Sequence, residues 1–526
     1  MLSRESKLIV FVAVLASLLE IIDSSIVNVA LPAMMGNLGA TLEDISMVVT
    51  GYAIANAIVL PVSAWLGSRI GRRRYYLGCI IGFTLASIAC GFAPNLYCLI
   101  IFRIFQGLLG GALLPTSQTL IYEQFPPEKA GLAGAIFGMS VMVGPALGPV
   151  MGGYLTDEFG WRSIFNINLP LGMLALFVGM MVIQDPPFQV EARKQPKVAF
   201  DKLGLFLLVS GIGCLQYFLE RGEADGWFSS TNIVVTFLIA MTALPLFIWW
   251  ELKIPNPIIN LRLFKDSAVQ NGTSLMFLLG FFLYSVVFLL PVFLGRTYHY
   301  DATQIGAFFI PGSLLTMAMM PIVGKLMQSG KNPKVLIMIG FLSIEICLFL
   351  MTRFSPLSPK AEIMRMLYVR GFAMAFLFVP INSSILSQYK GINMGQVAGM
   401  MNLFRQIGGS VGIALVATLL NLKSHQNYTD LQSKVTALSS QASQFSNQAQ
   451  IGLNSGLSSS VGMMTSTMGA NVASTKVLYW KVQNQVFMMS FLQLIYFLLI
   501  VMSLFLIPWW RLRLKRMAAP AVVDAH

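Results

Sequence analysis

Long apolar runs alternate with short polar segments along most of the chain. A helix that crosses a bilayer needs about 20 mostly apolar residues. Fourteen runs approach or reach that length, so the pattern predicts an all-α integral membrane protein with 14 transmembrane helices. The predicted helices lie at 8–32, 44–66, 75–93, 97–121, 131–155, 163–184, 202–220, 232–252, 269–295, 303–327, 334–352, 362–387, 396–420 and 483–508.

Basic residues are distributed unevenly between the loops. Arg69 and Arg72–Arg74 follow the second run, and four more lie in 511–516, whereas 33–43 and 91–96 contain none. Cytoplasmic loops carry an excess of Lys and Arg, so both termini are expected in the cytoplasm. This asymmetry accounts for much of the formal net charge of +13, and it favours contact with membrane lipids over binding to nucleic acid.

The composition narrows the class of protein further. Hydrophobic residues make up 56% of the chain and charged residues 11%, against about 25% charged in a soluble domain. The first run is too long for a cleaved signal peptide and lacks a small-residue cleavage site, so it is expected to stay as a helix. The five cysteines lie in or beside apolar runs without a CxxC pair, so neither disulfides nor a metal site are expected.

The sequence also argues against an ATP-driven pump or a membrane enzyme. It has no GxxxxGK[ST] loop, three histidines and no grouping of a nucleophile with a base. We therefore expect no cofactor.

Two longer polar segments interrupt the pattern, at 185–201 and 421–481. The first reads as a cytoplasmic linker. The second is rich in Ser, Gln and Asn with almost no Pro, and it is too long for a simple turn. It is either a helical hairpin that serves as a docking surface or an irregular polar loop.

The chain contains an internal repeat. The segment from Pro61 to Arg74 is echoed by Pro321 to Lys331, and a pattern from Arg103 to Pro115 in the fourth run is echoed in the twelfth. We predict two six-helix bundles at 1–185 and 266–526, separated by a linker and two inserted helices at 186–265. Transporters built from repeats bind their substrates near the bilayer midplane, where the repeats meet.

Two carboxylates, Glu20 and Asp23, lie inside the first run. An ionised Asp at that depth costs about 3 kcal/mol and by default indicates an ion or substrate pathway. At 1.5 Å per residue, Asp23 lies about 24 Å from the inner side and Arg103 about 9 Å from the outer side of a core about 30 Å thick. The two can therefore pair. Glu20 has no equally obvious cationic partner, so burial favours its neutral form.

Four segments resemble one family of transporters. They are Asp23-Ser-Ser-Ile-Val-Asn28 with Pro32 in the first run, Leu66 to Arg74 after the second, Arg103-Ile-Phe-Gln106-Gly107 in the fourth, and the Gly-Pro pattern from Gly138 to Gly153 in the fifth. The chain resembles the major facilitator superfamily, and within it the fourteen-span drug:proton antiporters of the EmrB/QacA type.

This resemblance implies a major facilitator fold and roles for particular residues. Proton coupling is expected to involve Asp23, Glu20 and Arg103. The motifs tied to conformational change are matched by Arg69, Gly71, Arg72, Arg73, Gly144, Pro145, Gly148, Pro149, Gly152 and Gly153. Ala64 and Ser68 replace the family's usual Gly and Asp, so the latch between the halves is expected to be weak or built otherwise.

The resemblance further implies proton-driven export of hydrophobic or amphipathic compounds from a bacterial inner membrane. The expected partners are a periplasmic membrane-fusion adaptor and an outer-membrane channel. Export of a narrow endogenous substrate, such as fatty acids or a metabolite, is the alternative. Polar residues within the runs are candidates to line the cavity: Asn28, Gln106, Gln118, Asn271, Tyr284, Asn382, Asn402 and Arg405. Glu345 has either a packing role or a functional one. Arg370, the echo of Arg103, either has a function or only stabilises its own half.

Overall fold

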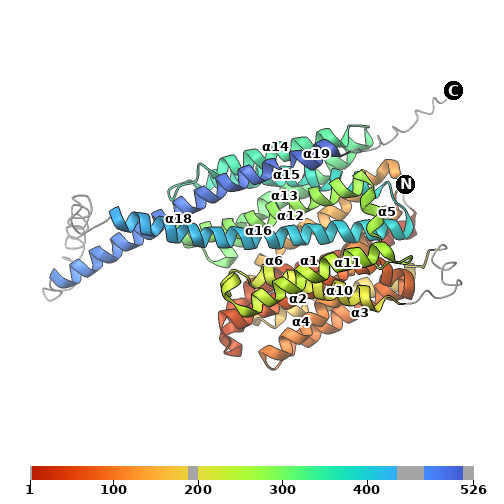
Figure 1. Cartoon of the computed structure of the whole chain (residues 1–526), viewed down its shortest axis with the longest axis horizontal. Helices are drawn as coiled ribbons and strands as arrows, with labels where there is room; N and C mark the ends of the chain where they lie inside the picture. Colours follow the sequence, from red (N-terminus) through yellow and green to blue (C-terminus); the bar gives the residue numbers. More distant parts are fainter. Residues whose placement is uncertain (1–2, 187–199, 435–466, 513–526) are drawn as a thin grey trace.

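A computed structural model describes residues 3–186, 200–434 and 467–512. Within these ranges every regular element is a helix, and 14 helices are long and apolar enough to cross a membrane. The predicted number of spans is therefore confirmed. The helices run roughly parallel to the long axis of the molecule, and the N-terminus lies at one end (Figure 1). We call this the N-terminal end.

Helices α1 to α8 form what we call the N-terminal half. The fourth span is broken into two helices at Gly111 and Ala112, and the sixth is also divided. The elements are α1 (Arg4–Leu38), α2 (Leu42–Ile70), α3 (Arg72–Gly91), α4 (Leu96–Gly110), α5 (Leu113–Glu123), η1 (Pro127–Lys129), α6 (Ala130–Phe159), α7 (Ser163–Asn166) and α8 (Asn168–Val182).

Two helices follow before the C-terminal half, which we define as α12 to α19. Local signals place the helix starts: Asp201, Asp266 and Asp301 each cap a free N–H group of the helix that follows. The elements are α10 (Lys202–Arg221), η2 (Trp227–Ser229), α11 (Thr231–Lys253), η3 (Leu261–Lys265), α12 (Ser267–Tyr298), α13 (Ala302–Gln328), α14 (Pro333–Met351), α15 (Lys360–Leu386), α16 (Gly391–Lys434), α18 (Thr467–Ser503) and α19 (Leu506–Arg511).

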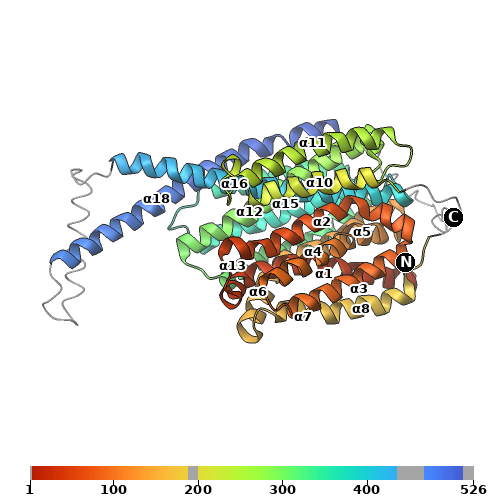
Figure 2. The ribbon, with the colours of Figure 1, turned by 60° about the horizontal axis from the view of Figure 1, so that its bottom comes forward.

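The polar segment at 421–481 is helical at both of its ends. Helix α16 continues to Lys434 and α18 begins at Thr467, so both exceed the predicted runs 396–420 and 483–508. The two helices extend well beyond the rest of the bundle (Figures 1 and 2). Asn427 of α16 donates hydrogen bonds to Ser490 and Gln493 of α18. The irregular-loop alternative is therefore wrong for these ends, while 435–466 lie outside the described residues.

Glycines of α6 let two other helices approach it closely. Gly144, Gly148 and Gly152 face Ile21, Ser25 and Ile26 of α1. Ser25 Oγ donates to the Gly144 carbonyl at 2.9 Å. The spacing of four residues places all three glycines on one face, as expected for a close helix contact. The side chain of Pro145 lies outside the described residues.

A second face of α6 contacts the C-terminal half along α13. Gly131 meets Gly324 near the N-terminal end, and Gly153 meets Thr303 near the opposite end. Between them Pro149 packs on Gly306. Helix α2 packs similarly against α16, where Ala64 meets Gly395. The two halves therefore meet along two helix pairs that flank the centre of the molecule.

We expect a methyl group at Gly144 to destabilise the fold. Its carbon would lie 2.1 Å from Ile21 Cγ2 and 2.9 Å from the Ile21 carbonyl oxygen, and this backbone cannot rotate away. Overpacking of this kind costs about 1–3 kcal/mol. Gly144→Ala should lower the free energy of unfolding measured in detergent by that amount. Gly78→Ala is the matched control, because nothing lies within 4 Å of its added carbon; equal stability of the two variants would contradict the packing.

Candidate functional site

The structure brings Asp23 and Arg103 into direct contact. Arg103 Nη1 donates to Asp23 Oδ2 at 2.5 Å, and the side chains are 1% and 0% exposed. Asp23 comes from α1 and Arg103 from α4, so the pairing that their depths predicted is present. Gln106 Nε2 and Asn168 Nδ2 each donate to the other carboxylate oxygen at 2.8 Å. Three side-chain donors therefore surround one buried carboxylate.

Arg103 is held on several sides as well. Its Nη1 donates to Gln106 Oε1 at 2.7 Å, and its Nε donates to the Val48 carbonyl at 3.3 Å. The guanidinium lies 4.1 Å from the centre of the Tyr52 ring, where a cation–π contact adds to its stabilisation. A buried charge is tolerated when it is paired and hydrogen-bonded, and this arrangement meets both conditions.

Glu20, one turn away on α1, binds neutral donors. Asn56 Nδ2 donates to Oε1 at 2.8 Å and the Leu114 N–H donates to Oε2 at 2.8 Å. The first N–H groups of a helix lack partners inside the helix. Because the fourth span restarts at Leu113, the Leu114 N–H is available to Glu20. The carboxylate thus faces the positive end of α5.

A third polar cluster joins the two halves. Gln118 of α5 donates to Asn382 Oδ1 of α15 and accepts from Asn402 Nδ2 of α16, both at 2.7 Å. Arg405 Nη2 donates to Asn402 Oδ1 at 3.3 Å. The charge of Arg405 also acts on Glu20, so the C-terminal half contributes a cation to the surroundings of the first helix.

The remaining candidates lie elsewhere. Asn28 is exposed on α1, where it donates to the Ser24 carbonyl. Asn271 bonds to Ser267 at the start of α12, and Tyr284 covers Gly409 between α12 and α16. Within the described residues, none of these three side chains forms a hydrogen bond with the polar clusters.

Two charged groups of the C-terminal half stand apart from these clusters. Glu345 is partly exposed on α14, and one of its oxygens is buried without a hydrogen-bond partner among the described residues. Arg370, the echo of Arg103, stacks 5.0 Å from the centre of the Phe309 ring, and within the described part of the chain its buried Nε and Nη1 atoms have no hydrogen-bond partners. The repeat therefore conserves a buried arginine without conserving its carboxylate.

Sequence reasoning missed several groups of the site. Asn56 and Asn168 are polar residues inside apolar runs, and their depth in the membrane could have been estimated in the same way as that of Arg103. Ser87 supports Asn168 from α3 by accepting from its Nδ2 at 2.8 Å. The Leu114 N–H had only an indirect signal, the glycine pair before Pro115 that favours a break in the helix.

The arginine-rich loop after α2 lies at the N-terminal end. Gly71 has φ of +106°, a conformation that favours glycine. Arg69 stacks on Trp65, and the Arg73 guanidinium donates to the Met180 carbonyl. Arg72 pairs with Glu123 at 2.6 Å, which joins α3 to the end of α5 within one half.

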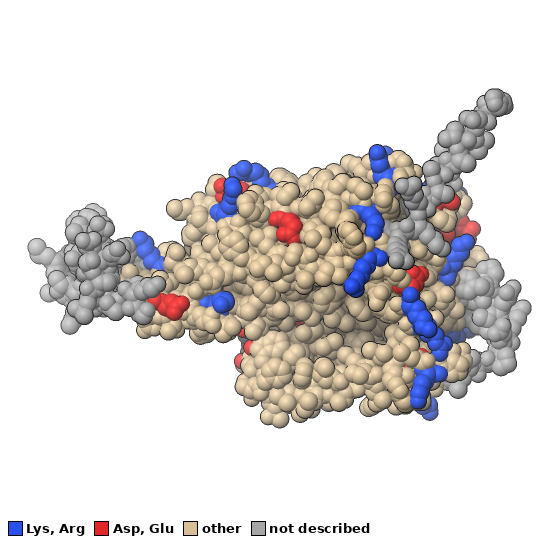
Figure 3. Space-filling model, turned by 45° about the horizontal axis from the view of Figure 1, so that its top comes forward, with Lys and Arg blue, Asp and Glu red and all other residues tan. Residues whose placement is uncertain are grey.

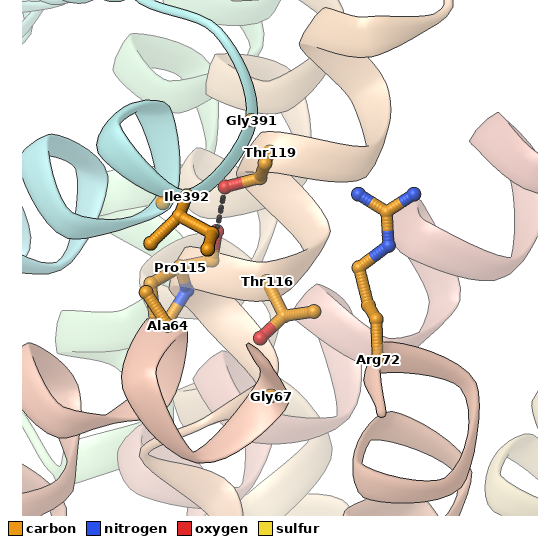
Figure 4. Close-up of a pocket in the computed structure, with 9 residues that line it drawn as sticks. Ala64, Gly67, Arg72, Pro115, Thr116, Thr119, Gly391 and Ile392 are labelled. Carbon is orange, nitrogen blue, oxygen red and sulfur yellow. Dashed lines mark hydrogen bonds between the residues drawn. The ribbon is translucent and has the colours of Figure 1, made fainter. Parts of the chain in front are cut away.

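A small cavity of about 40 Å³ lies beside this loop. Figure 4 shows Ile392 of α16 next to Ala64 on one side of it, and Arg72 on the other side. The start of α16 therefore sits close against α2 and α5 at this end. Little space is left between the halves here.

Comparison with known proteins gives this architecture a family. Residues 13–413 match the family model described as Major Facilitator Superfamily. The chain therefore belongs to the major facilitator superfamily, a class of membrane transporters.

Within this superfamily the chain is similar to named exporters. It is 33% identical over 422 residues to the multidrug export protein EmrB of Escherichia coli (strain K12), covering 80% of this chain and 81% of EmrB. It is 32% identical over 426 residues to the fatty acid resistance protein FarB of Neisseria gonorrhoeae, covering 81% and 83%. The crystal structure of the human organic anion transporter MFSD10 (TETRAN) shares the fold, with a TM-score of 0.61 at 14% identity over 97% of this chain and 100% of MFSD10.

We expect Asp23 and Arg103 to be strongly coupled in stability. Asp23→Asn or Arg103→Gln alone leaves an uncompensated buried charge, which costs about 3 kcal/mol. The double variant should lose about 2 kcal/mol less than the sum of the single losses, as measured by unfolding in detergent. Combining Asp23→Asn with Asn271→Ala, a distant change, should be additive. Additive losses for the Asp23 and Arg103 pair would show that the contact does not couple them.

Proposed function

We propose that the protein exports hydrophobic or amphipathic compounds in exchange for protons, by alternating access. The observation that carries this proposal is the membrane-buried Asp23–Arg103 pair, with Glu20 one turn away. Similarity to EmrB, a multidrug export protein, supports multidrug efflux as the activity. The role fits a transporter rather than an enzyme.

Protonation of Asp23 would change the interactions around it. The ionised carboxylate accepts from Arg103, Gln106 and Asn168. A proton removes its charge, which leaves Arg103 without a counter-charge and weakens the link between α1 and α4. A proton moving inward supplies about 1.4 kcal/mol per pH unit and about 2.3 kcal/mol per 100 mV. That energy favours the change to the opposite-facing state.

Substrate would bind between the halves, near Gln118, Asn402 and Arg405. Among the charged groups near this region are Glu20 and Arg405, whose charges interact. Glu20 would favour cationic amphiphiles. Arg405 would favour anionic ones, and together with the similarity to FarB it supports the alternative of a narrow substrate such as a fatty acid. A substrate panel separates the two.

We infer the orientation from the basic residues. Lys and Arg gather at the N-terminal end on the face shown in Figure 3, which would be the cytoplasmic side. We call it the inner end from here on. At this end α5 reaches α15 through Tyr122 and Ser383, whose hydroxyl oxygens are 3.1 Å apart. These contacts close the inner end.

The expected division into two bundles, 1–185 and 266–526, with inserted helices at 186–265, is retained as a proposal. It follows the helix pairs that meet between the halves, α6 with α13 and α2 with α16. The inserted helix α10 also contacts both halves: Arg221 bonds to Ser46 of α2, and Gln216 bonds to Ser410 of α16.

We further propose a location in the bacterial inner membrane, with a periplasmic adaptor and an outer-membrane channel as partners. The supporting feature is the extension of α16 and α18 beyond the bundle, on the side opposite the N-terminus (Figure 1). Such an extension offers a surface outside the membrane that transport itself does not require.

Neutralising Asp23 should abolish substrate-driven proton release. The Asp23→Asn variant cannot exchange a proton at this position, so adding substrate to the purified, folded protein should release none. The assay is a pH-indicator measurement across cationic, neutral and anionic amphiphiles. Glu345→Gln is the control and should release protons as the wild type does, because Glu345 lies outside the polar clusters. Unchanged release from Asp23→Asn would remove Asp23 from the mechanism.

Deleting residues 430–475 should separate transport from resistance. We expect substrate transport in membrane vesicles to persist, because the described contacts that join the halves involve none of the deleted residues. Drug resistance of intact cells should fall, because an adaptor would lose its surface. Loss of both activities would assign the segment a folding role, and retention of both would argue against the adaptor.

A further inference from the structure

Helix α5 connects the carboxylate of Glu20 with the contact between the halves. At its start the Leu114 N–H donates to Glu20. Four residues later in the same helix, Gln118 reaches the C-terminal half. The helix has 11 residues, and Gly111 and Ala112 separate it from α4.

Gln118 is the central residue of this contact. Its side chain is 0% exposed, and both of its polar atoms bond across the interface, to Asn382 and Asn402. The two asparagines also donate to carbonyls of their own helices, those of Phe378 and Ala398. Separation of the halves would leave the Gln118 amide without these partners unless water enters. The bonds therefore favour a closed inner end.

The hydrogen bonds of Glu20 fit the ionised form, since both oxygens accept from N–H groups. A protonated carboxyl group has one O–H, so it accepts less well from Leu114 and Asn56 and no longer attracts the start of α5. Other titratable or charged groups also interact with Glu20. They are Asp23 of α1, Tyr52 of α2, Tyr76 of α3 and Arg405 of α16.

We propose that Gln118 is the coupling residue through which protonation of Glu20 opens the inner end. The ionised carboxylate holds the start of α5, and α5 holds Gln118 against Asn382 and Asn402. A proton on Glu20 releases α5, the two bonds of Gln118 weaken, and the halves separate at the inner end. This inference rests on the proposed exchange of protons for substrate and assigns one step of it.

The test measures the distance between the halves at the inner end by pulsed electron paramagnetic resonance. Spin labels are attached through Glu128→Cys of η1 and Lys331→Cys before α14, both exposed positions. Cys98→Ser and Cys214→Ser remove the partly exposed native thiols. The populations of short and long distances give the ratio of closed to open molecules.

Gln118→Leu should raise the open-to-closed ratio about 25-fold at neutral pH, at about fivefold for each net hydrogen bond lost. Asn382→Leu removes one of the two bonds from the opposite half without changing α5, and should raise the ratio about fivefold. Gln124→Leu is the matched control, because Gln124 at the end of α5 bonds only weakly, at 3.5 Å, to Leu120 of its own helix. It should leave the ratio unchanged.

Glu20→Gln should raise the ratio in the wild-type background and have no further effect in Gln118→Leu. That non-additivity is the specific signature of coupling through Gln118. Additive effects, or an unchanged ratio in both Gln118→Leu and Asn382→Leu, would overturn the proposal. Proton release reports separately on the proposed function: if wild-type protein releases no protons with any substrate, exchange fails while the distance measurement still decides whether Gln118 holds the halves together.

Discussion

The burial of charge at the centre of a membrane protein constrains everything around it. Asp23 and Arg103 are almost fully excluded from solvent, and a lone charge at such a place is expensive. The carboxylate therefore collects three side-chain donors from two other spans, with Arg103 and Gln106 on α4 and Asn168 on α8. These contacts fix α1 against its neighbours, and the polar network thus organises the N-terminal half as well as supplying a group that can bind a proton.

Small residues provide the complementary constraint. Hydrophobic side chains gain little from one another in lipid, so helix contacts depend on close backbone approach and on hydrogen bonds. Helix α6 satisfies both conditions on its face toward α1, where Gly144 and Gly148 meet Ile21 and Ser25. Its other face contacts α13 through Gly131 and Gly153. Helix α6 therefore links α1, which carries Glu20 and Asp23, to the C-terminal half.

Much of this could be predicted from the sequence, for physical reasons. Long apolar runs determine the number of spans, and depth along a helix is simple arithmetic, so the pairing of Asp23 with Arg103 was accessible. The partners of Glu20 were not, because one is the backbone N–H of Leu114, exposed only by a break in the helix. Contacts between distant helices, such as Gln118 with Asn402, depend on rotations about helix axes that periodicity alone leaves undetermined. Asn28 and Asn271 show how far such predictions reach, because a polar residue in an apolar run need not belong to the polar clusters between the helices.

The length of α16 has a mechanical consequence. It is one helix of 44 residues, about 66 Å long, in a core about 30 Å thick. Its first turns pack against α2, while its last turns lie well outside the bundle (Figure 2). A rigid rod of this kind acts as a lever. A tilt of about 10° of the C-terminal half would displace a point about 36 Å along it by about 6 Å. A protein bound at the far end would therefore undergo a larger displacement than the helices near the centre, without itself binding a proton or a substrate.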